Sequence, residues 1–497
     1  MRSASIAFMQ ELSKGNRNYQ ATVEITLADG TVINGTRTIY NYETGSEIVM
    51  SEPYLTNENI WENGLTIEDA VSNDGEFQLG AAIINECTLV LNNSGERFSK
   101  YDFADAVVVP HISLYDEDGV LAGTVDMGVY NVSEADYDEG IVTLTCLDNM
   151  VKFDKPYVEH GPTGTISSII ANCCQVCGVT AGSTVSTFPH YDMLFDAPLP
   201  SGDNATYRQV ISWCAEMAGQ FARCDQNGEL QIGFYDFGAL NSIINDGLDG
   251  GSFNDSSIPY GDGDTADGGA FSPWNTGYVF DGGSFTSTPD VHVISSSFSS
   301  KLNIKDVAIT GFSITTDITD DSFISNIPLW SSSSTYTVGD IVRKHVDSSG
   351  SHDVTYDVYQ CNANISTPEA WNDAHWSKLS SLTRWWGISK DYVVAIDNEL
   401  IKYDYDADTV AYNLSPDFFT EIMGVPYTPK YVFCPGEITH LSDPTIEAGD
   451  VAIFVDRNGV IHPIIVSSTT FALGGTQSTQ SSAAPKANRF IPPGARQ

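Results

Sequence analysis

The 497-residue sequence has few basic residues, with 23 Lys and Arg against 65 Asp and Glu and a formal net charge of −42. So few cations cannot displace the counterions of a nucleic-acid backbone, which excludes an electrostatic nucleic-acid binder. The same shortage excludes attraction to an anionic membrane surface. Only 18% of residues are charged while 41% are hydrophobic, so the composition is that of a folded chain and not of a disordered polyelectrolyte.

Long apolar runs are also missing. No stretch approaches the ~20 residues that a membrane-spanning helix needs. The amino-terminal segment, Met1 to Met9, lacks the extended apolar core and the small-residue cleavage site of a signal peptide. We therefore expect synthesis in a cytoplasm and no membrane anchor.

The nine cysteines are odd in number and scattered, which is not the pattern of a disulfide framework. Three of them lie close enough to suggest a zinc site, but they share one helical face with isoleucines: Ile166, Ile169, Ile170, Cys173, Cys174 and Cys177. Thr165 can begin this helix and Gly178 can end it. The spacing therefore predicts small buried thiols in a helix core.

Catalytic motifs are absent as well. The sequence has no G-x-S-x-G elbow, no H-E-x-x-H, no phosphate-binding loop and no dinucleotide fingerprint after a strand. The nine histidines are isolated, and the acidic runs Asp136–Glu139 and Asp404–Asp406 are typical of solvated turns. We predict a protein that is not an enzyme, with no catalytic, cofactor-binding or metal-binding residue and no cofactor.

What the sequence does contain predicts a β-rich α+β protein. Residues 20–155 alternate short β-branched and aromatic runs with polar turns, the texture of a sandwich or barrel. The predicted divisions are an N-terminal β-barrel domain (1–158), an α+β helix-hairpin module (159–237), a Gly/Asp/Ser-rich loop (238–290), a second β-barrel domain (291–328 and 381–475), an inserted module (329–380) and a flexible tail (476–497).

The helix-hairpin module carries the sharpest local signals. Thr206 and Gln209 form a capping-box signature ahead of a second amphipathic helix. Asn227-Gly228 separates two short strands, and Asn458-Gly459 does the same near the C-terminus, so each predicts a β-hairpin.

The Gly/Asp/Ser-rich loop repeats an Asp-Gly-Gly-x-Phe pattern at irregular spacings. Asp262, Asp264 and Asp267 are spaced like the start of a calcium loop, but the twelfth position is Pro273 and not glutamate. A long exposed loop is the favoured interpretation and calcium binding is the alternative.

The helix-hairpin module contains four short motifs: Tyr207–Trp213, Ala215–Gly219, Phe221-Ala222-Arg223 and Asn227–Leu230. Together they resemble the central signature of phage tail-hub (baseplate-hub) proteins of long-tailed bacteriophages and prophages. Phe77–Gly80, Asp126–Tyr130 and Thr143–Met150 resemble the family's first barrel, and Asp397–Ile401, Pro435-Gly436, Glu447–Asp450 and Gly474-Gly475 resemble its second.

This resemblance implies two hub-type β-barrels flanking the α+β module. It implies a homotrimeric ring at the tail tip that adapts the sixfold tail tube to a threefold tip and encloses the DNA conduit. The implied partners are tail-tube and distal tail proteins, the tape-measure protein and receptor-binding proteins. Members often carry a C-terminal peptidase or lysozyme; only 22 residues follow Gly475, so we expect a structural hub of the virion without that domain.

The inserted module is rich in aromatic residues, among them Trp330, Tyr336, Trp371 and Trp376. With these positions it resembles the small carbohydrate-binding modules of chitinases. The resemblance implies that these residues contact host-surface glycans, with Trp330 and Trp371 as the surface candidates. A module of about 50 residues also needs aromatics to fill its own core, so a purely structural role stays open.

If the hub encloses a channel, the acidic balance predicts a net-negative lumen that does not retain passing DNA. Two other functions stay open, namely a stand-alone glycan-binding adhesin and a tail-associated cell-wall hydrolase.

Overall fold

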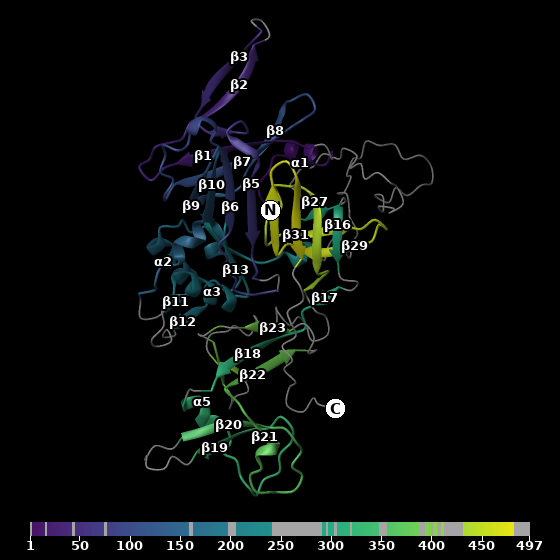
Figure 1. Cartoon of the computed structure of the whole chain (residues 1–497). Helices are drawn as coiled ribbons and strands as arrows, with labels where there is room; N and C mark the ends of the chain where they lie inside the picture. The colour runs from purple at the N-terminus through teal and green to yellow at the C-terminus, as the bar shows by residue number, and fades with distance from the viewer. Residues whose placement is uncertain are drawn as a thin grey trace, which may run out of the picture.

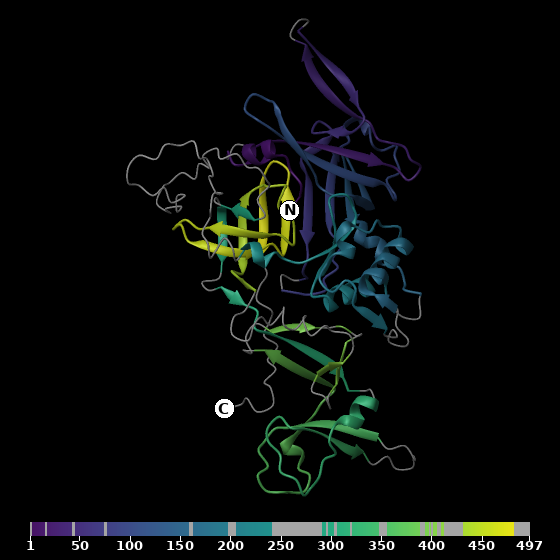
Figure 2. The same ribbon diagram turned by 180° about the vertical axis from the view of Figure 1, so that it is seen from behind.

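The computed structural model describes residues 2–14, 17–41, 45–73, 77–158, 163–196, 205–240, 291–294, 297–302, 306–318, 321–346, 355–387, 393–396, 398, 401–404, 409–411 and 431–481. The fold is β-rich α+β, as predicted. The molecule is elongated (Figures 1 and 2), with the N-terminal strands at one end and the strands of residues 341–378 at the other.

A 12-stranded antiparallel sheet dominates the fold. In spatial order it runs β16 (Ser297–Leu302), β27 (Gly436–Leu441), β31 (Thr476–Ser481), β30 (Ser468–Ala472), β5 (Ile60–Ala70), β6 (Glu86–Asn92), β10 (Ile141–Asp148), β9 (Tyr130–Asp138), β7 (Val107–Tyr115), β1 (Asn18–Thr26) and β4 (Leu55–Thr56), with β8 (Leu121–Asp126) also on β7. In β6 and β10 alternate residues are buried, because one face of the sheet covers a core.

The prediction of two separate barrels is corrected by the structure. The β30–β5 pairing joins the C-terminal strands to the N-terminal ones, from Ser468↔Ala70 to Ala472↔Thr66. Within the described residues the path ends at β16 and β4 and does not close on itself. The pairing with β30 satisfies the backbone N–H and C=O groups along the edge of β5. In two separate barrels, each barrel would have to pair such an edge with one of its own strands.

A second correction concerns the tail. The segment 476–481, expected to begin a flexible tail, is strand β31, paired with both β27 and β30. Its inward side chains are polar but bonded: Gln477 Nε2 donates to Thr469 Oγ1 (2.7 Å), and Thr479 Oγ1 lies 2.8 Å from His440 Nε2. Polar residues can fill a buried strand when each has a partner.

The helix-hairpin module follows the sequence prediction closely. Helix α2 (Ile166–Cys177) begins at Thr165, whose hydroxyl accepts from Ser168 N, and ends at Gly178 in the left-handed region (φ 72°). Helix α3 (Tyr207–Met217) has the predicted capping box of Thr206 and Gln209. The cysteines of α2 form no disulfide and are buried in the module core, as predicted.

The hairpin β13 (Phe221–Cys224) and β14 (Leu230–Gly233) turns at Asn227-Gly228, and β28 (Val451–Val455) and β29 (Ile461–Ile465) turn at Asn458-Gly459. The other paired strands are β2 (Gly35–Asn41) with β3 (Ser46–Glu52), β11 (Thr163–Thr165) with β12 (Leu194–Asp196), β15 (His292–Ile294) with β28, β17 (Val307–Ala308) with β26 (Val432–Phe433), β24 (Lys402–Asp404) with β25 (Thr409–Ala411), and β18 (Gly311–Asp317) between β22 (Ser381–Gly387) and β23 (Val393–Ile396). The remaining helices in the described residues are α1 (Ile6–Leu12), α5 (Asp321–Asn326), η1 (Ser94–Glu96), η2 (Asn149–Phe153), η3 (Ser183–Ser186) and η4 (Asp373–His375).

Residues 329–380 contain a small sheet of β19 (Ile341–Val346), β20 (Thr355–Cys361) and β21 (Trp376–Lys378). Along the chain, this sheet falls after β18 and before β22. Those two strands pair with each other from Gly311↔Gly387 to Asp317↔Ser381. The chain therefore leaves and re-enters the body at adjacent strands, and the module stands at the end of the molecule (Figure 1).

Of the Gly/Asp/Ser-rich loop, only residues 238–240 are described, so the calcium alternative at Asp262, Asp264 and Asp267 lies outside the described residues. None of the helices in the described part of the chain combines the length and apolar character needed to cross a bilayer.

Candidate functional site

The four aromatic residues predicted for glycan contact lie in one cluster of the small module. Trp376, on β21, is 5% exposed and packs in its core, while Trp330, Tyr336 and Trp371 are half-buried against that core. The Tyr336 ring meets Trp376 edge to face at 5.0 Å, and its hydroxyl accepts from Ser331 N (2.7 Å). The structure thus brings together residues spread over 47 positions of sequence.

Trp371 makes several contacts within this cluster. Its ring stacks on Trp376 at 5.0 Å with an interplanar angle of 13°, and the Lys344 ammonium lies 4.1 Å from its centroid. Its indole N–H donates to Asp373 Oδ1 at 2.6 Å. Through these contacts the Trp371 ring stabilises the packing of the module.

Trp330 lies at the edge of the same cluster. It meets Trp371 at 86° with ring centroids 5.3 Å apart. Its backbone N–H donates to Arg343 O (2.8 Å), which ties the start of the module to β19. Of the two surface candidates, Trp330 is therefore the one whose ring is less engaged by the module's described contacts.

A second constellation joins the helix-hairpin module to the C-terminal strands. The Arg223 guanidinium, on β13, donates to the Glu447 carboxylate and to the Ala448 carbonyl. Both charged side chains are only 11% exposed. Burial opposes the charge of Glu447, but the guanidinium groups of Arg223 and Arg2 hold the pKa of this carboxyl below its ordinary value.

Arg2 and Asp69 complete this buried junction. Arg2 Nη2 donates to Asp69 Oδ2 (3.1 Å), and Arg2 Nη1 donates to Ile446 O (2.9 Å). Asp69 Oδ2 also accepts from Ala448 N (3.1 Å). We call Arg2, Asp69, Arg223 and Glu447 the ionic junction: two cations and two anions that join the N-terminus, β5, β13 and the loop before β28.

The ionic junction borders a cavity of about 20 Å³, close to the room that one water molecule occupies. Asn85, Tyr130 and Asp148 also line it. Gly449 lies next to the ionic junction and packs against Phe221. Its φ is 96°, and a Cβ at this position would lie 2.7 Å from the Phe221 ring. A side chain at position 449 would therefore push the hairpin away from the C-terminal strands.

Sequence reasoning missed the ionic junction. Phe221-Ala222-Arg223 and Glu447–Asp450 were recognised only as separate motifs, although their contact spans 224 positions. The available signal was the scarcity of cations, because an arginine inside an otherwise apolar motif such as Phe221–Cys224 needs a buried anion as its partner.

No protein-family model matches the chain, and no curated protein matches it. Among solved structures it is similar to the 43 kDa tail protein of prophage MuSo2 from Shewanella oneidensis, with 9% identity over 94% of this chain and 99% of that chain and a TM-score of 0.38. It is also similar to a chain of the lidded Francisella PdpA–VgrG complex, with 8% identity over 96% of this chain and a TM-score of 0.36. The chain spans 54% of that second protein's length.

Proposed function

We propose that the protein is a structural subunit of a phage-type tail tip, a hub that assembles as a homotrimer and encloses the DNA conduit. The observation that carries the proposal is the ionic junction, because it joins two of the hub-like motifs, Phe221-Ala222-Arg223 and Glu447–Asp450, through a buried contact. The proposed partners are the tail-tube, distal tail, tape-measure and receptor-binding proteins.

The projecting hairpin β2–β3 supports an assembly role. Figure 1 shows it extending from the end of the molecule opposite the small module. Opposed residues in an antiparallel pair share a face, so Ile39, Ile48 and Met50 form one apolar stripe, and Tyr40 and Val49 lie on the reverse side. All five are exposed, Val49 by 65%. A two-stranded hairpin is marginal alone in water, which favours its burial in an assembly.

The oligomeric mass of the purified full-length chain tests the proposal. Native mass spectrometry should give about 162 kDa, three times the 53.9 kDa chain. A monomer that binds glycans would instead favour the stand-alone adhesin and contradict the hub.

A hairpin variant then tests the assembly surface. Replacing Ile39 and Ile48 together by threonine keeps strand-forming side chains but removes the apolar stripe, so the trimer should weaken at least tenfold. The control is Val120→Thr, which changes a 61%-exposed valine at the β7–β8 turn. If the two variants form the trimer equally well, the β2–β3 hairpin is not part of the interface.

The acidic balance supports a conduit that does not hold DNA. The trimer should show no retention of duplex DNA in a gel-shift assay at low salt, where electrostatic binding is strongest. Retention by the trimer would contradict a net-negative lumen.

Glycan contact is the finer part of the proposal and rests on Trp330. Trp330→Ala should reduce glycan-array binding while leaving the unfolding temperature of the module nearly unchanged, because the residue is at the cluster edge. Trp376→Ala removes the module's buried centre and should unfold it. If glycan binding is unchanged in Trp330→Ala, Trp330 does not contact glycan and the proposal of glycan contact through this module is contradicted.

We also propose that the chain has no catalytic activity of its own. Incubation with purified cell walls should release neither peptides nor sugars. Release of either product would establish the hydrolase alternative.

A further inference from the structure

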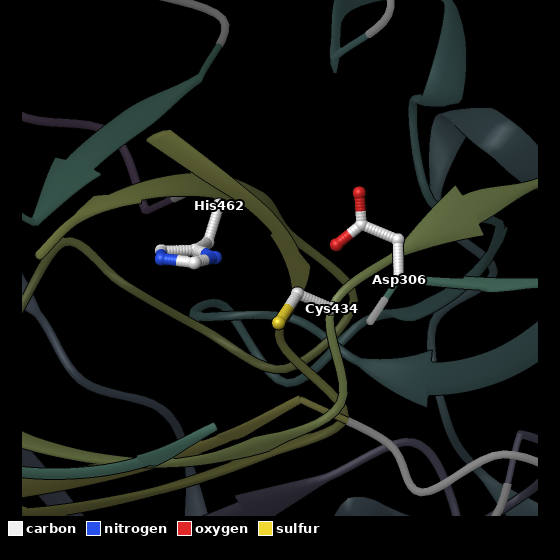
Figure 3. Close-up of side chains that lie close together, drawn as sticks. All are labelled: Asp306, Cys434 and His462. Carbon is white, nitrogen blue, oxygen red and sulfur yellow. The ribbon is translucent and has the colours of Figure 1, made fainter. Parts of the chain in front are cut away.

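Three groups that can ligate a metal ion meet beside the hairpin β28–β29. They are the Asp306 carboxylate, the Cys434 thiol and the His462 imidazole, and their ligand atoms lie within 4.8 Å of one another. Figure 3 shows the three side chains lying close together. In the described part of the chain no other such group of three lies this close.

The backbone builds this arrangement. Strands β17 and β26 pair antiparallel with Val307 opposite Phe433, so the next register position sets Asp306 opposite Cys434. The Cys434 N–H donates to Pro463 O (2.6 Å), which places the thiol beside the residue that follows His462 on β29. Main-chain pairing, and not the reach of long flexible side chains, therefore brings the three together.

Burial is graded across the cluster. Cys434 is fully buried, the His462 side chain is 20% exposed, and Asp306 is exposed. The sulfur is thus the innermost ligand, and the carboxylate lies on the side from which an ion would enter. The thiol proton must leave to solvent as a metal–sulfur bond forms, because the thiolate is the form that binds the metal.

A fourth residue orients the imidazole. His462 Nε2 lies 3.5 Å from Asp456 Oδ2. Asp456 is itself fixed in the β28–β29 turn, where its other oxygen accepts from the N–H groups of Asn458 and Val460, each at 2.8 Å. A carboxylate on one ring nitrogen is the usual outer partner of a metal-bound histidine and leaves Nδ1 for the metal.

We propose that Asp306, Cys434 and His462 bind a zinc ion, with water completing a tetrahedral site. Thiolate, imidazole and carboxylate together suit Zn²⁺ and not the oxygen-seeking Mg²⁺ or Ca²⁺. Zinc bonds of about 2.0–2.3 Å place ligand atoms roughly 3.3–3.8 Å apart, so modest side-chain rotations close the site. The ion would hold the pair β17–β26 to the hairpin β28–β29, which is a role independent of the proposed tail function.

Metal analysis and cobalt spectroscopy on the full-length chain test the site. The metal-free protein should bind one Zn²⁺ per chain and gain thermal stability on binding. Co²⁺ in its place should show thiolate-to-cobalt charge-transfer absorption, which Cys434→Ser abolishes. Cys177→Ala is the control, because it removes a buried thiol of helix α2 that is not part of the site and should keep this absorption.

Asp306→Asn keeps the test independent of folding, since this residue is exposed. It should weaken zinc binding about tenfold or more, as should His462→Gln. No zinc bound at one equivalent, a cobalt spectrum without the thiolate band, or unchanged zinc affinity in both Asp306→Asn and Cys434→Ser would overturn the proposal.

Discussion

Asp148 shows how far burial alters a single residue. It ends β10 and caps the helix η2, where its Oδ1 accepts from Met150 N at 3.0 Å. Its Oδ2 is buried and has no hydrogen-bond partner within the described residues. Burial raises the pKa of this carboxyl to about 7, outweighing the backbone hydrogen bonds that lower it.

This shift predicts a pH dependence of stability. The folded chain holds a proton on Asp148 between about pH 4 and 7 that the unfolded chain releases, so this group makes stability fall as pH rises through that window. Asp148→Asn should flatten this slope and raise the free energy of unfolding at pH 8 by up to about 4 kcal/mol. Urea unfolding from pH 4.5 to 8 measures it. The exposed Asp118→Asn is the control, and parallel profiles for the Asp148 variant and the wild-type chain would contradict the prediction.

At the scale of elements, the helices and hairpins follow from neighbouring residues. The α3 capping box has Thr206 Oγ1 accepting from Gln209 N (3.2 Å) and Gln209 Oε1 accepting from Thr206 N (2.9 Å). Both bonds lie within four residues, so the sequence pattern was sufficient to predict them. Strand β31 is the opposite case, because Thr476–Ser481 has no apolar residue and is a strand only through its neighbours β27 and β30.

The cap gives a prediction at this scale. Thr206→Ala leaves helix-terminal N–H groups without their acceptor and should lower the free energy of unfolding by about 1 kcal/mol. Ser167→Ala, in the first turn of α2, is the matched control and should change it by less than about 0.5 kcal/mol. Denaturant unfolding of both variants measures the difference, and an equal effect would show that the cap adds nothing.

At the scale of the whole molecule, the ionic junction holds segments that the chain keeps far apart. Arg223→Met leaves the Glu447 carboxylate buried without its closest arginine partner, with Arg2 Nε 3.9 Å away. Removing one partner of a buried pair costs about 3–5 kcal/mol. We expect a loss of that size in the free energy of unfolding at pH 7, and a smaller loss when Glu447→Leu is added to the same chain.

The comparison for this variant is Arg208→Met. Arg208 Nε pairs with Asp154 at 2.6 Å, but both side chains are about one-third exposed, so this pair should contribute about 1 kcal/mol or less. Thermal or denaturant unfolding distinguishes the two arginines. Equal losses from the two variants would mean that the junction does not lock the body together.

The sequence by itself determined the β-rich class, the helix α2 with its buried thiols, the capping box of α3 and the Asn-Gly hairpins. These depend on side-chain periodicity and turn chemistry within a few residues, so the information is local. Only the tertiary structure decided that β30 pairs with β5, that Arg223 meets Glu447, and that Asp306, Cys434 and His462 converge. Such contacts join strand edges and buried charges that are hundreds of residues apart in the sequence. The spacing of neighbouring residues therefore does not predict them.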